Sequence, residues 1–217
     1  MNGLMGKPID QKNIGLAKLL YELRQDLDIY CLISVNADEI NKIGVGKSFF
    51  GRLQQLVLMS ISLNICKIFE KEKGYELNSI RGVIRYLATD TLEISNDNRL
   101  IKFIQKYEGP SSFTDSTSAL QLTIDGFEKK YNSEFEQFKS FRDKKAAHSE
   151  YDVCFDRLPS YECMESLFSF GAEFYNLISA AFIGIGPCDL MTGRKVKIGL
   201  KKLLEKLGLG TVKTNME

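Results

Sequence analysis

Residues 56–66 read Leu-Val-Leu-Met-Ser-Ile-Ser-Leu-Asn-Ile-Cys, a stretch that is apolar nearly all the way round a helix. Such a stretch, inside a longer helix from Ser48 to about Lys73, is typical of the most buried helix of a domain. Elsewhere, apolar residues recur at spacings of three and four, and the alternation of a β-strand is almost absent. The pattern predicts an all-α fold in which Ser48 caps the central helix.

Further helices are expected around this one. The spacing predicts a first helix from about Asp10 to Glu39, two shorter helices within residues 77–107 and a long helix over about 116–147. A later helix, capped by Ser160, is expected to carry one apolar face formed by Leu167, Phe170, Phe174, Ile178 and Ala181. Together these elements predict an all-helical domain of residues 1–186.

Length and charge narrow the class of protein. The chain has 217 residues, 29 Lys and Arg, 28 Asp and Glu, and one His. This length allows one domain with a real core and excludes two large ones. The net charge of +1 argues against disorder and against a uniformly basic nucleic-acid binder. A lone His148 excludes sites that need two imidazoles of one chain, and we expect neither a metal nor a cofactor.

The charge is unevenly distributed along the chain. The segment 194–213 has seven basic residues and one acidic residue. Residues 187–217 are therefore expected to form a basic amphipathic C-terminal segment, with a stripe of leucines at Leu200, Leu203, Leu204 and Leu207. Either the stripe packs on the body and the lysines stay solvated, or the basic face steers RNA or docks an acidic partner.

The cysteines and the hydropathy of the sequence indicate in which cellular compartment the protein is expected. The chain has five cysteines without CxxC spacing, Cys31, Cys66, Cys154, Cys163 and Cys188. This pattern favours reduced thiols in a cytoplasmic protein. The N-terminus has no signal-peptide pattern, and the longest apolar run is about ten residues, too short to cross a bilayer. We expect a cytoplasmic protein with no membrane contact.

A glycine-containing turn allows two interpretations. Residues 41–48, Asn-Lys-Ile-Gly-Val-Gly-Lys-Ser, imitate the end of a phosphate-binding P-loop, and residues 29–35 could be the strand before it. However, Asn41 replaces the first glycine of that motif, and no later apolar strand ends in an aspartate that could bind magnesium. A helix–turn–helix corner capped by Ser48 is the favoured interpretation.

The long helix changes character near its end. Its aromatic residues fall on one face over four turns: Phe127, Tyr131, Phe135, Phe138 and Phe141. The same face then becomes cationic at Arg142, Lys145 and His148. Unpaired buried charge is costly, so this end must leave the core, meet a carboxylate or line a cleft for anions. A guanidinium can hold two phosphate oxygens and an imidazole can move protons near neutral pH, so a phosphodiester is a natural ligand.

Cleavage of RNA by its own 2′-OH needs both a base and an acid. Because one chain supplies one His, the chemistry favours a homodimer in which two Arg142/His148 pairs face each other. The alternative is a purely structural role, in which Arg142 is a surface arginine and His148 ends the helix and pairs with Glu150 or Asp152.

The segment Arg142-Asp-Lys-Lys-Ala-Ala-His148 resembles the Arg-polar-x(3–5)-His motif of HEPN domains (higher eukaryotes and prokaryotes nucleotide-binding). Within these domains it is most similar to the AbiU-type abortive-infection branch. The similarity extends to residues 51–63, 68–70, 77–80 and 159–162, and it covers about residues 16–183.

The resemblance implies an up-and-down helical bundle with additional short helices. Such a bundle would dimerise through the motif-bearing helices and act as a metal-independent endoribonuclease of defence or toxin–antitoxin type. Its partners would be RNA, a second copy and an antitoxin protein. Arg142 and His148 would be the catalytic pair, and Asp143 the polar residue that orients them. Phosphate affinity would come from Lys139, Lys144 and Lys145. The alternative, since many relatives keep the fold without activity, is a catalytically inactive HEPN module that binds RNA or a partner protein.

Two features differ from the family pattern. Some HEPN toxins carry a Tyr two residues after the His, where a partner nucleotidyltransferase modifies it, but here Glu150 takes that place and Tyr151 follows. The spacing from Arg142 to His148 puts the two on different sides of an ideal helix. A helix end or bend near Ala147 is therefore required.

Overall fold

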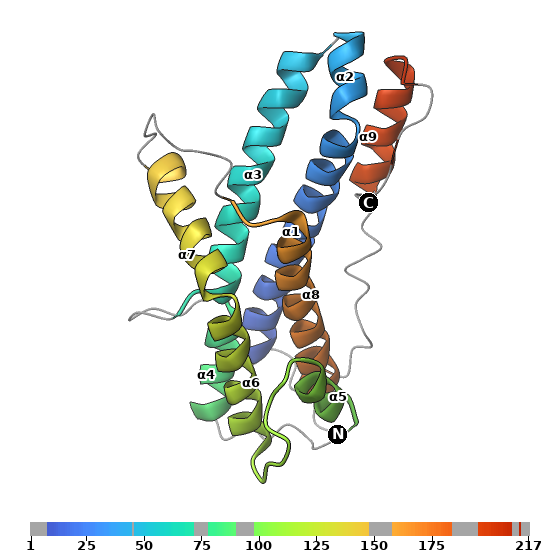
Figure 1. Ribbon diagram of the computed structural model, residues 1–217. Helices are drawn as coiled ribbons and strands as arrows, with labels where there is room; N and C mark the ends of the chain where they lie inside the picture. Colours follow the sequence, from blue (N-terminus) through green and yellow to red (C-terminus); the bar gives the residue numbers. More distant parts are fainter. Residues whose placement is uncertain are drawn as a thin grey trace.

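The computed structural model describes residues 8–44, 46–71, 78–89, 98–147, 158–183, 195–209 and 213. All regular secondary structure in these residues is helical, which confirms the all-α class (Figure 1). The long helices lie side by side and alternate in direction, and short helices lie at the two ends of the bundle (Figure 1).

The centre of the bundle is an antiparallel pair of helices, α1 (Pro8–Val35) and α3 (Lys47–Phe69) (Figure 1). In the sequence, the short α2 (Ala37–Ile43) connects them, and it lies at one end of the bundle (Figure 1). The single first helix predicted to run to Glu39 is therefore wrong, because the chain leaves helical geometry at Asn36 (φ −108°, ψ 9°). The Asn36 side chain competes with the backbone ladder by donating from Nδ2 to the carbonyl of Leu32 at 2.8 Å.

The corner between α2 and α3 depends on two glycines. Gly44 (φ 73°) ends α2 and Gly46 (φ 76°) precedes α3, and both adopt the left-handed conformation that glycine tolerates best. Gly46 is the N-cap residue of α3, and no side chain caps the helix. The prediction that Ser48 caps it is wrong, while the favoured helix–turn–helix corner is confirmed.

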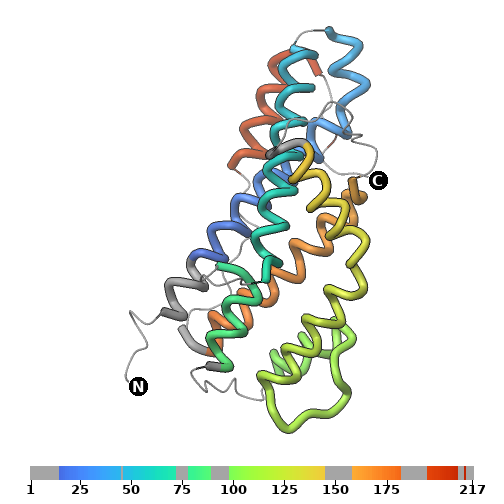
Figure 2. Tube along the Cα trace, turned by 90° about the vertical axis from the view of Figure 1, so that its left-hand side faces the viewer, coloured from blue at the N-terminus to red at the C-terminus, as the bar shows by residue number. Residues whose placement is uncertain are grey.

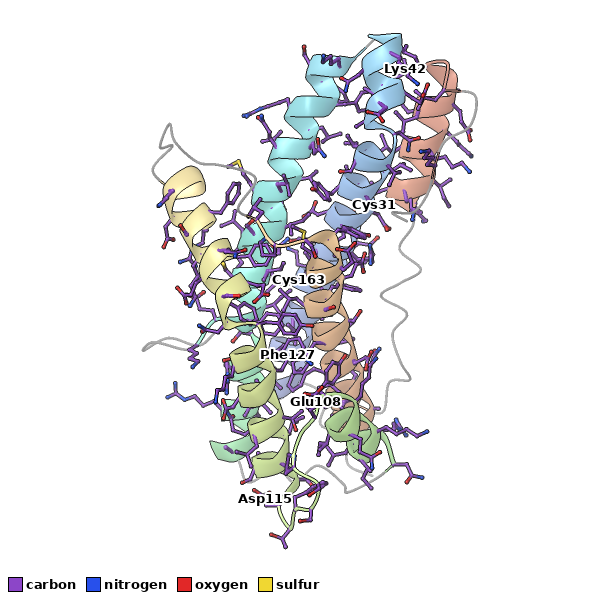
Figure 3. The ribbon with its side chains drawn as sticks, viewed as in Figure 1. Cys31, Lys42, Glu108, Asp115, Phe127 and Cys163 are labelled. Atoms are coloured by element: carbon purple, nitrogen blue, oxygen red, sulfur yellow. The ribbon has the colours of Figure 1, made fainter. Side chains whose placement is uncertain are left out.

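Most of the quoted stretch in the middle of α3 is buried as predicted, with Ile61 and Ile65 fully inaccessible, but its first residue, Leu56, is 44% exposed. Together with α1 and α8 it forms the main hydrophobic core, which extends down to α4 (Ile80–Thr89) and α5 (Asn98–Lys106). These are the two short helices expected within residues 77–107. In Figure 3 the ring of Phe127 lies inside the bundle, whereas Asp115 and Lys42 lie at its opposite ends.

The long helix predicted over 116–147 is interrupted. In its place are α6 (Ser116–Lys130), α7 (Asn132–Phe141) and the π-helical η1 (Arg142–Ala147). Tyr131 separates the first two, since its backbone leaves helical geometry (φ −103°, ψ 21°) while its ring packs 4.8 Å from that of Phe127. The aromatic face survives the break, and its phenylalanines are all buried: Phe127, Phe135, Phe138 and Phe141.

The next helix, α8 (Tyr161–Ile178), begins where predicted. Ser160 is its N-cap, and the hydroxyl oxygen accepts a hydrogen bond from the backbone N–H of Cys163 at 3.3 Å. After Ile178 the chain continues as the π-helical η3 (Ser179–Ile183). A π turn holds more residues than an α turn, so Ala181 is exposed although the rest of its predicted face is buried.

The C-terminal α9 (Lys195–Lys206) packs against α1 (Figures 1 and 2). Leu204 is buried and Leu200 and Leu207 are partly buried in a second core, whereas Leu203 is 42% exposed. The chain is also pinned beyond α9 by the Asn36 side chain, which accepts from the N–H of Lys213 at 3.0 Å and donates to its carbonyl at 2.9 Å. The interpretation that the leucine stripe packs on the body is confirmed except at Leu203.

A buried network of charges joins α1 to α8. The Arg24 guanidinium donates to both carboxylate oxygens of Glu165, at 2.7 and 2.8 Å, and to Asp28 at 3.0 Å. Tyr161 also donates to Glu165. On the other side, Lys197 of α9 lies 3.9 Å from Asp28. The charge of Arg24 is thus compensated by carboxylates of α1 and α8, and these ion pairs hold the two helices together.

Candidate functional site

The candidate site lies where the aromatic face of α7 ends. Phe141 is buried, and its helix packs against α3. At the next residue the chain changes from α-helical to π-helical hydrogen bonding, so the side chains of η1 follow a different angular spacing from those of α7. The expected departure from an ideal helix thus begins at Arg142, earlier than the bend expected near Ala147.

Arg142 is held by its neighbour. Its Nε donates to the Asp143 carboxylate at 2.8 Å, and the Arg142 side chain is 31% exposed. This hydrogen bond is the main cause that raises the pKa of Arg142, while partial burial acts the other way. The guanidinium is therefore charged at any physiological pH, and it has four further N–H donors besides Nε. The predicted pairing of Arg142 with Asp143 is present.

A cavity of about 360 Å³ opens beside Arg142. Its walls come from the C-terminal end of α3 and from the α6–α7 stretch, which lie side by side in Figure 1. The floor is aromatic, with the rings of Phe69 and Phe135 4.8 Å apart. The lining residues are Cys66, Phe69, Glu70, Lys71, Glu128, Asn132, Phe135, Lys139 and Arg142.

The cavity carries charges of both signs. Its cations are Lys71, Lys139 and Arg142, and its carboxylates are Glu70 and Glu128. Glu128 is already compensated by Arg81, whose guanidinium nitrogen lies 2.6 Å from its Oε2. The cations also have carboxylate partners: Lys139 pairs with Glu136, Arg142 with Asp143, and Lys71 lies 3.9 Å from Glu128. The wall formed by α7 and η1 therefore presents cations whose charge is shared, and the N–H donors of Arg142 beyond Nε can bind an anionic group.

Cys66 lies in the cavity but does not supply a reactive thiolate. Burial raises the pKa of the Cys66 thiol to about 11, although the nearby charges of Arg142 and Lys139 act to lower it. The thiol is therefore protonated at neutral pH, and a protonated thiol is a weak nucleophile and a poor base.

The predicted site residues have different outcomes. The structure brings Arg142, Asp143 and Lys139 to one place, with Lys139 paired to Glu136 at 2.6 Å on the solvent side. Lys144 is exposed on η1 and does not line the cavity. His148 and the side chain of Lys145 lie outside the described residues, as do Glu150, Tyr151, Asp152, Cys154 and Cys188.

Several lining residues were missed by sequence reasoning. Cys66, Glu70 and Lys71 come from the end of α3, and Glu128 comes from α6. No local motif links them to Arg142, because they meet it through the packing of α3 against α7. The available signal was the aromatic face of residues 127–141, which indicated that this helix packs on another through its phenylalanines.

The phosphate-loop alternative does not fit the structure. The loop needs a strand before its glycines, but residues 29–35 lie inside α1. Lys47 is an exposed residue at the start of α3, and Gly44 is the left-handed residue that ends α2. We therefore assign this segment to the corner between the two helices.

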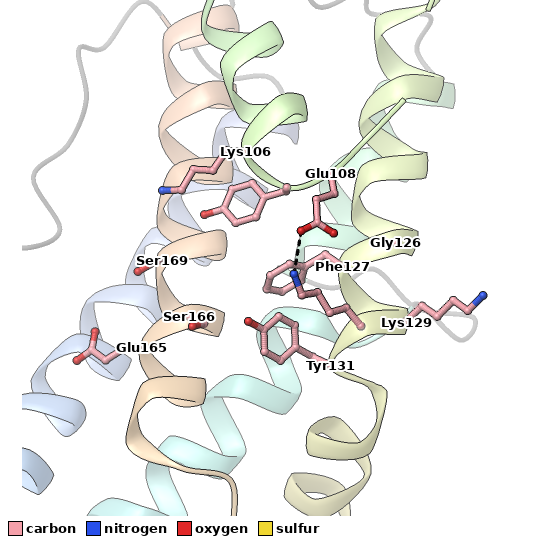
Figure 4. Close-up of a pocket in the computed structure, with 11 residues that line it drawn as sticks. Lys106, Glu108, Gly126, Phe127, Lys129, Tyr131, Glu165, Ser166 and Ser169 are labelled. Carbon is pink, nitrogen blue, oxygen red and sulfur yellow. Dashed lines mark hydrogen bonds and ion pairs between the residues drawn. The ribbon is translucent and has the colours of Figure 1, made fainter. Parts of the chain in front are cut away.

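A second cavity, of about 780 Å³, lies between α5, α6 and α8 and shares no lining residue with the first (Figure 4). Its larger volume does not make it the site of the predicted chemistry, because none of the motif side chains that the structure describes, Arg142, Asp143 and Lys144, lines it. Among the described residues no His, Cys, Asp and Glu side chains gather as a metal-binding group. None of the described helices is long and apolar enough to span a membrane.

No protein-family model matches the chain, and no curated protein and no solved structure is significantly similar to it.

Proposed function

We propose that this protein is a metal-independent endoribonuclease of the HEPN type, related to defence or toxin–antitoxin systems, with a composite site across a homodimer. The observation that carries the proposal is the setting of Arg142: a charged guanidinium, oriented by Asp143, at the edge of a cavity that Lys139 also lines. Arg–phosphate recognition needs a planar donor group held in a fixed orientation.

The proposed reaction is attack of an RNA 2′-OH on the adjacent phosphorus. The new P–O bond closes a 2′,3′-cyclic phosphate as the bond to the 5′-oxygen breaks. His148 of one chain takes the 2′-OH proton, and His148 of the second chain gives a proton to the leaving 5′-oxygen. Arg142 stabilises the charge that develops on the non-bridging oxygens. No step needs a metal ion.

The surroundings of the other partly buried arginines support the choice of Arg142. Arg24 is bound to Glu165 and Asp28, and Arg81 is bound to Glu128 and Asp125, so their charges are used within the fold. Lys139, Lys144 and Lys145 would add affinity for the flanking phosphates through charge that salt can screen.

The test is cleavage of mixed RNA by the purified protein in EDTA, followed by analysis of the ends. We expect 2′,3′-cyclic phosphate and 5′-hydroxyl ends, and a loss of rate on the order of 10²–10⁴ in His148→Ala and in Arg142→Ala. Arg52→Ala, which removes an exposed arginine of α3 outside the cavity, is the matched control and should cleave as the wild type does. Equal cleavage by His148→Ala, or a requirement for Mg²⁺, would overturn the proposal.

A second candidate is a catalytically inactive HEPN module that holds RNA or a partner protein through the same cavity wall, which carries Lys139 and Arg142. It is favoured by one observation: the described cavity offers cations for binding, while its one thiol, Cys66, has a pKa too high for proton transfer at neutral pH. This candidate predicts RNA binding that weakens with salt and with Arg142→Ala, and no cleavage at any pH.

A further inference from the structure

The larger cavity has the dimensions of a small-molecule site. Its volume of about 780 Å³ falls within the range of ligand pockets in proteins. It lies between the end of α5, the last turns of α6 and the outer side of α8 (Figure 4). The proposed ribonuclease chemistry does not use any of its residues.

Three aromatic rings form one side of this cavity. The innermost, Phe127, stacks on Phe170 behind it, with centroids 3.8 Å apart and planes 14° apart. Two tyrosines flank Phe127: Tyr131, at 4.8 Å, and Tyr107, which meets it edge-on at 5.6 Å. Because Tyr107 and Tyr131 are only partly buried, they offer ring surface to a molecule in the cavity.

Two of the three lysines that line the cavity are paired with carboxylates. Lys106 pairs with Glu173 at 2.5 Å, and Lys130 pairs with Glu108 at 3.1 Å. The Lys129 side chain points away from the cavity (Figure 4). The interior is therefore close to electrically neutral, and neither an anion nor a cation would gain a free counter-charge there.

Glu165 is the carboxylate at the inner wall, and it too is compensated. Burial acts to raise the pKa of Glu165, but hydrogen bonds from Arg24 and Tyr161 outweigh burial and lower it. The carboxylate is thus ionised and balanced by the Arg24 guanidinium. To a ligand, Glu165 offers a hydrogen-bond acceptor whose negative charge is balanced by Arg24.

Polar groups opposite the rings can bind the edge of a ligand. The hydroxyls of Ser166 and Ser169 lie one helical turn apart on α8 and both line the cavity (Figure 4). Ser166 donates its proton to the carbonyl of Glu162 at 2.8 Å, which leaves its oxygen as an acceptor. The Tyr107 hydroxyl is already hydrogen-bonded to Glu173, so the polar edge of a ligand would meet the serines.

We infer that this cavity binds a small, uncharged, planar heteroaromatic molecule. Its ring would lie against the tyrosine rings, and its polar edge would face the serines of α8. The neutralised charges select against charged compounds of the same size, and the aromatic wall selects against saturated ones.

Gly126 allows the cavity to be filled without disturbing the fold. It lies in α6 and lines the cavity, and a Cβ added there meets no atom within 4 Å. Gly51 of α3 is a matched control, since it is also helical and exposed, its added Cβ meets no atom within 4 Å, and it does not line the cavity. Leucine at either position also suits a helix better than glycine does.

The experiment is ligand-observed NMR with quinoxaline and theophylline as uncharged heteroaromatic probes. Benzoate, benzylamine and myo-inositol serve as anionic, cationic and saturated comparators. We expect the two probes to bind the full chain with Kd on the order of 1 mM or tighter, and the comparators at least tenfold more weakly. Gly126→Leu should abolish binding and Gly51→Leu should retain it.

Tyr131→Leu provides a second variant and is expected to weaken binding of both probes several-fold by removing one ring. Three results would overturn the inference. These are no binding of either probe to the wild type, equal binding to Gly126→Leu and Gly51→Leu, or comparators that bind as well as the probes.

Discussion

Arg24 and Arg142 show two opposite uses of the same side chain. Arg24 lies between α1 and α8, almost inaccessible, and donates to Glu165, Asp28 and Tyr161. Arg142 lies at the end of α7, partly exposed beside a cavity, with a hydrogen bond to the exposed Asp143. The first arginine is enclosed by its counter-ions, whereas the second is oriented by one. The difference separates a charge that holds the fold from a charge that can meet a ligand.

The largest effect expected from this comparison is on stability. Arg24→Met removes the main counter-ion of Glu165 and of the buried Asp28, and leaves the more distant Lys197, 3.9 Å from Asp28, as the remaining cation. Removing one partner of a buried ion pair typically costs about 3–5 kcal/mol, so we expect the free energy of unfolding to fall by that amount. Urea denaturation followed by circular dichroism measures it.

The matched change at the other arginine is Arg142→Met. Because exposed ion pairs contribute little, we expect a loss of at most about 1 kcal/mol in the same measurement. A loss at Arg142 as large as that at Arg24 would mean that both arginines serve the fold, and it would remove the distinction between the two regions.

Asp26 adds a third case to the comparison, a partly buried carboxylate whose charge has no basic partner in the described part of the chain. Its Oδ2 is buried without a hydrogen-bond partner among the described residues. Burial raises the pKa of Asp26 to about 6, although a hydrogen bond with Ser60 acts against the shift. In the unfolded chain the pKa is about 3.9. Ionisation of Asp26 thus opposes folding, and the cost develops as the pH rises from about 4 to above 6.

Asp26→Asn should therefore stabilise the protein at neutral pH. We expect a gain of about 1 kcal/mol near pH 7.5, allowing for the solvent that reaches part of the carboxyl, and no difference from the wild type near pH 3.5. Urea denaturation across this pH range gives the difference. A gain that is independent of pH would contradict the assignment to ionisation.

The last pair of changes concerns helix ends, and its smaller member has the smallest expected effect. Asp115 caps α6, since its carboxylate accepts from the backbone N–H groups of Thr117 at 3.1 Å and Ser118 at 2.9 Å. Ser48 makes no capping bond to α3. Asp115→Ala should lower the free energy of unfolding by about 1 kcal/mol and Ser48→Ala by less than about 0.5 kcal/mol. Equal losses would show that Ser48 caps its helix after all.

Much of the fold could be predicted from periodicity. Two patterns each predicted a helix that packs against others: the apolar stretch at 56–66 and the aromatic face of 127–141. Most of the apolar side chains in both are buried in the structure. The breaks could not be predicted. At Asn36 the side chain bonds the carbonyl of Leu32, four residues earlier, and the backbone of the distant Lys213. The long-range contact with Lys213 leaves no local pattern in the sequence.

The candidate site was predictable only in part. Arg142 and Asp143 are adjacent in sequence, so their hydrogen bond needed no tertiary information. Lys71 and Glu128 reach the same cavity from other helices, and only packing brings them there. The π-helical geometry of η1 could not be predicted from the spacing of apolar residues either. That spacing does not reveal a change in the backbone hydrogen-bond pattern over one turn.

Binding of an RNA strand that cannot be cleaved tests most directly whether Arg142 meets a phosphate. With a 2′-O-methylated oligonucleotide, Kd is measured over a range of salt concentrations for the wild type, Arg142→Met and Arg52→Met. We expect Arg142→Met to bind more weakly and to reduce the slope of log Kd against log salt by about 0.7, the value for one phosphate contact in a single strand. Arg52→Met should behave as the wild type. Identical affinity and slope in Arg142→Met would contradict the assignment of Arg142 to a substrate.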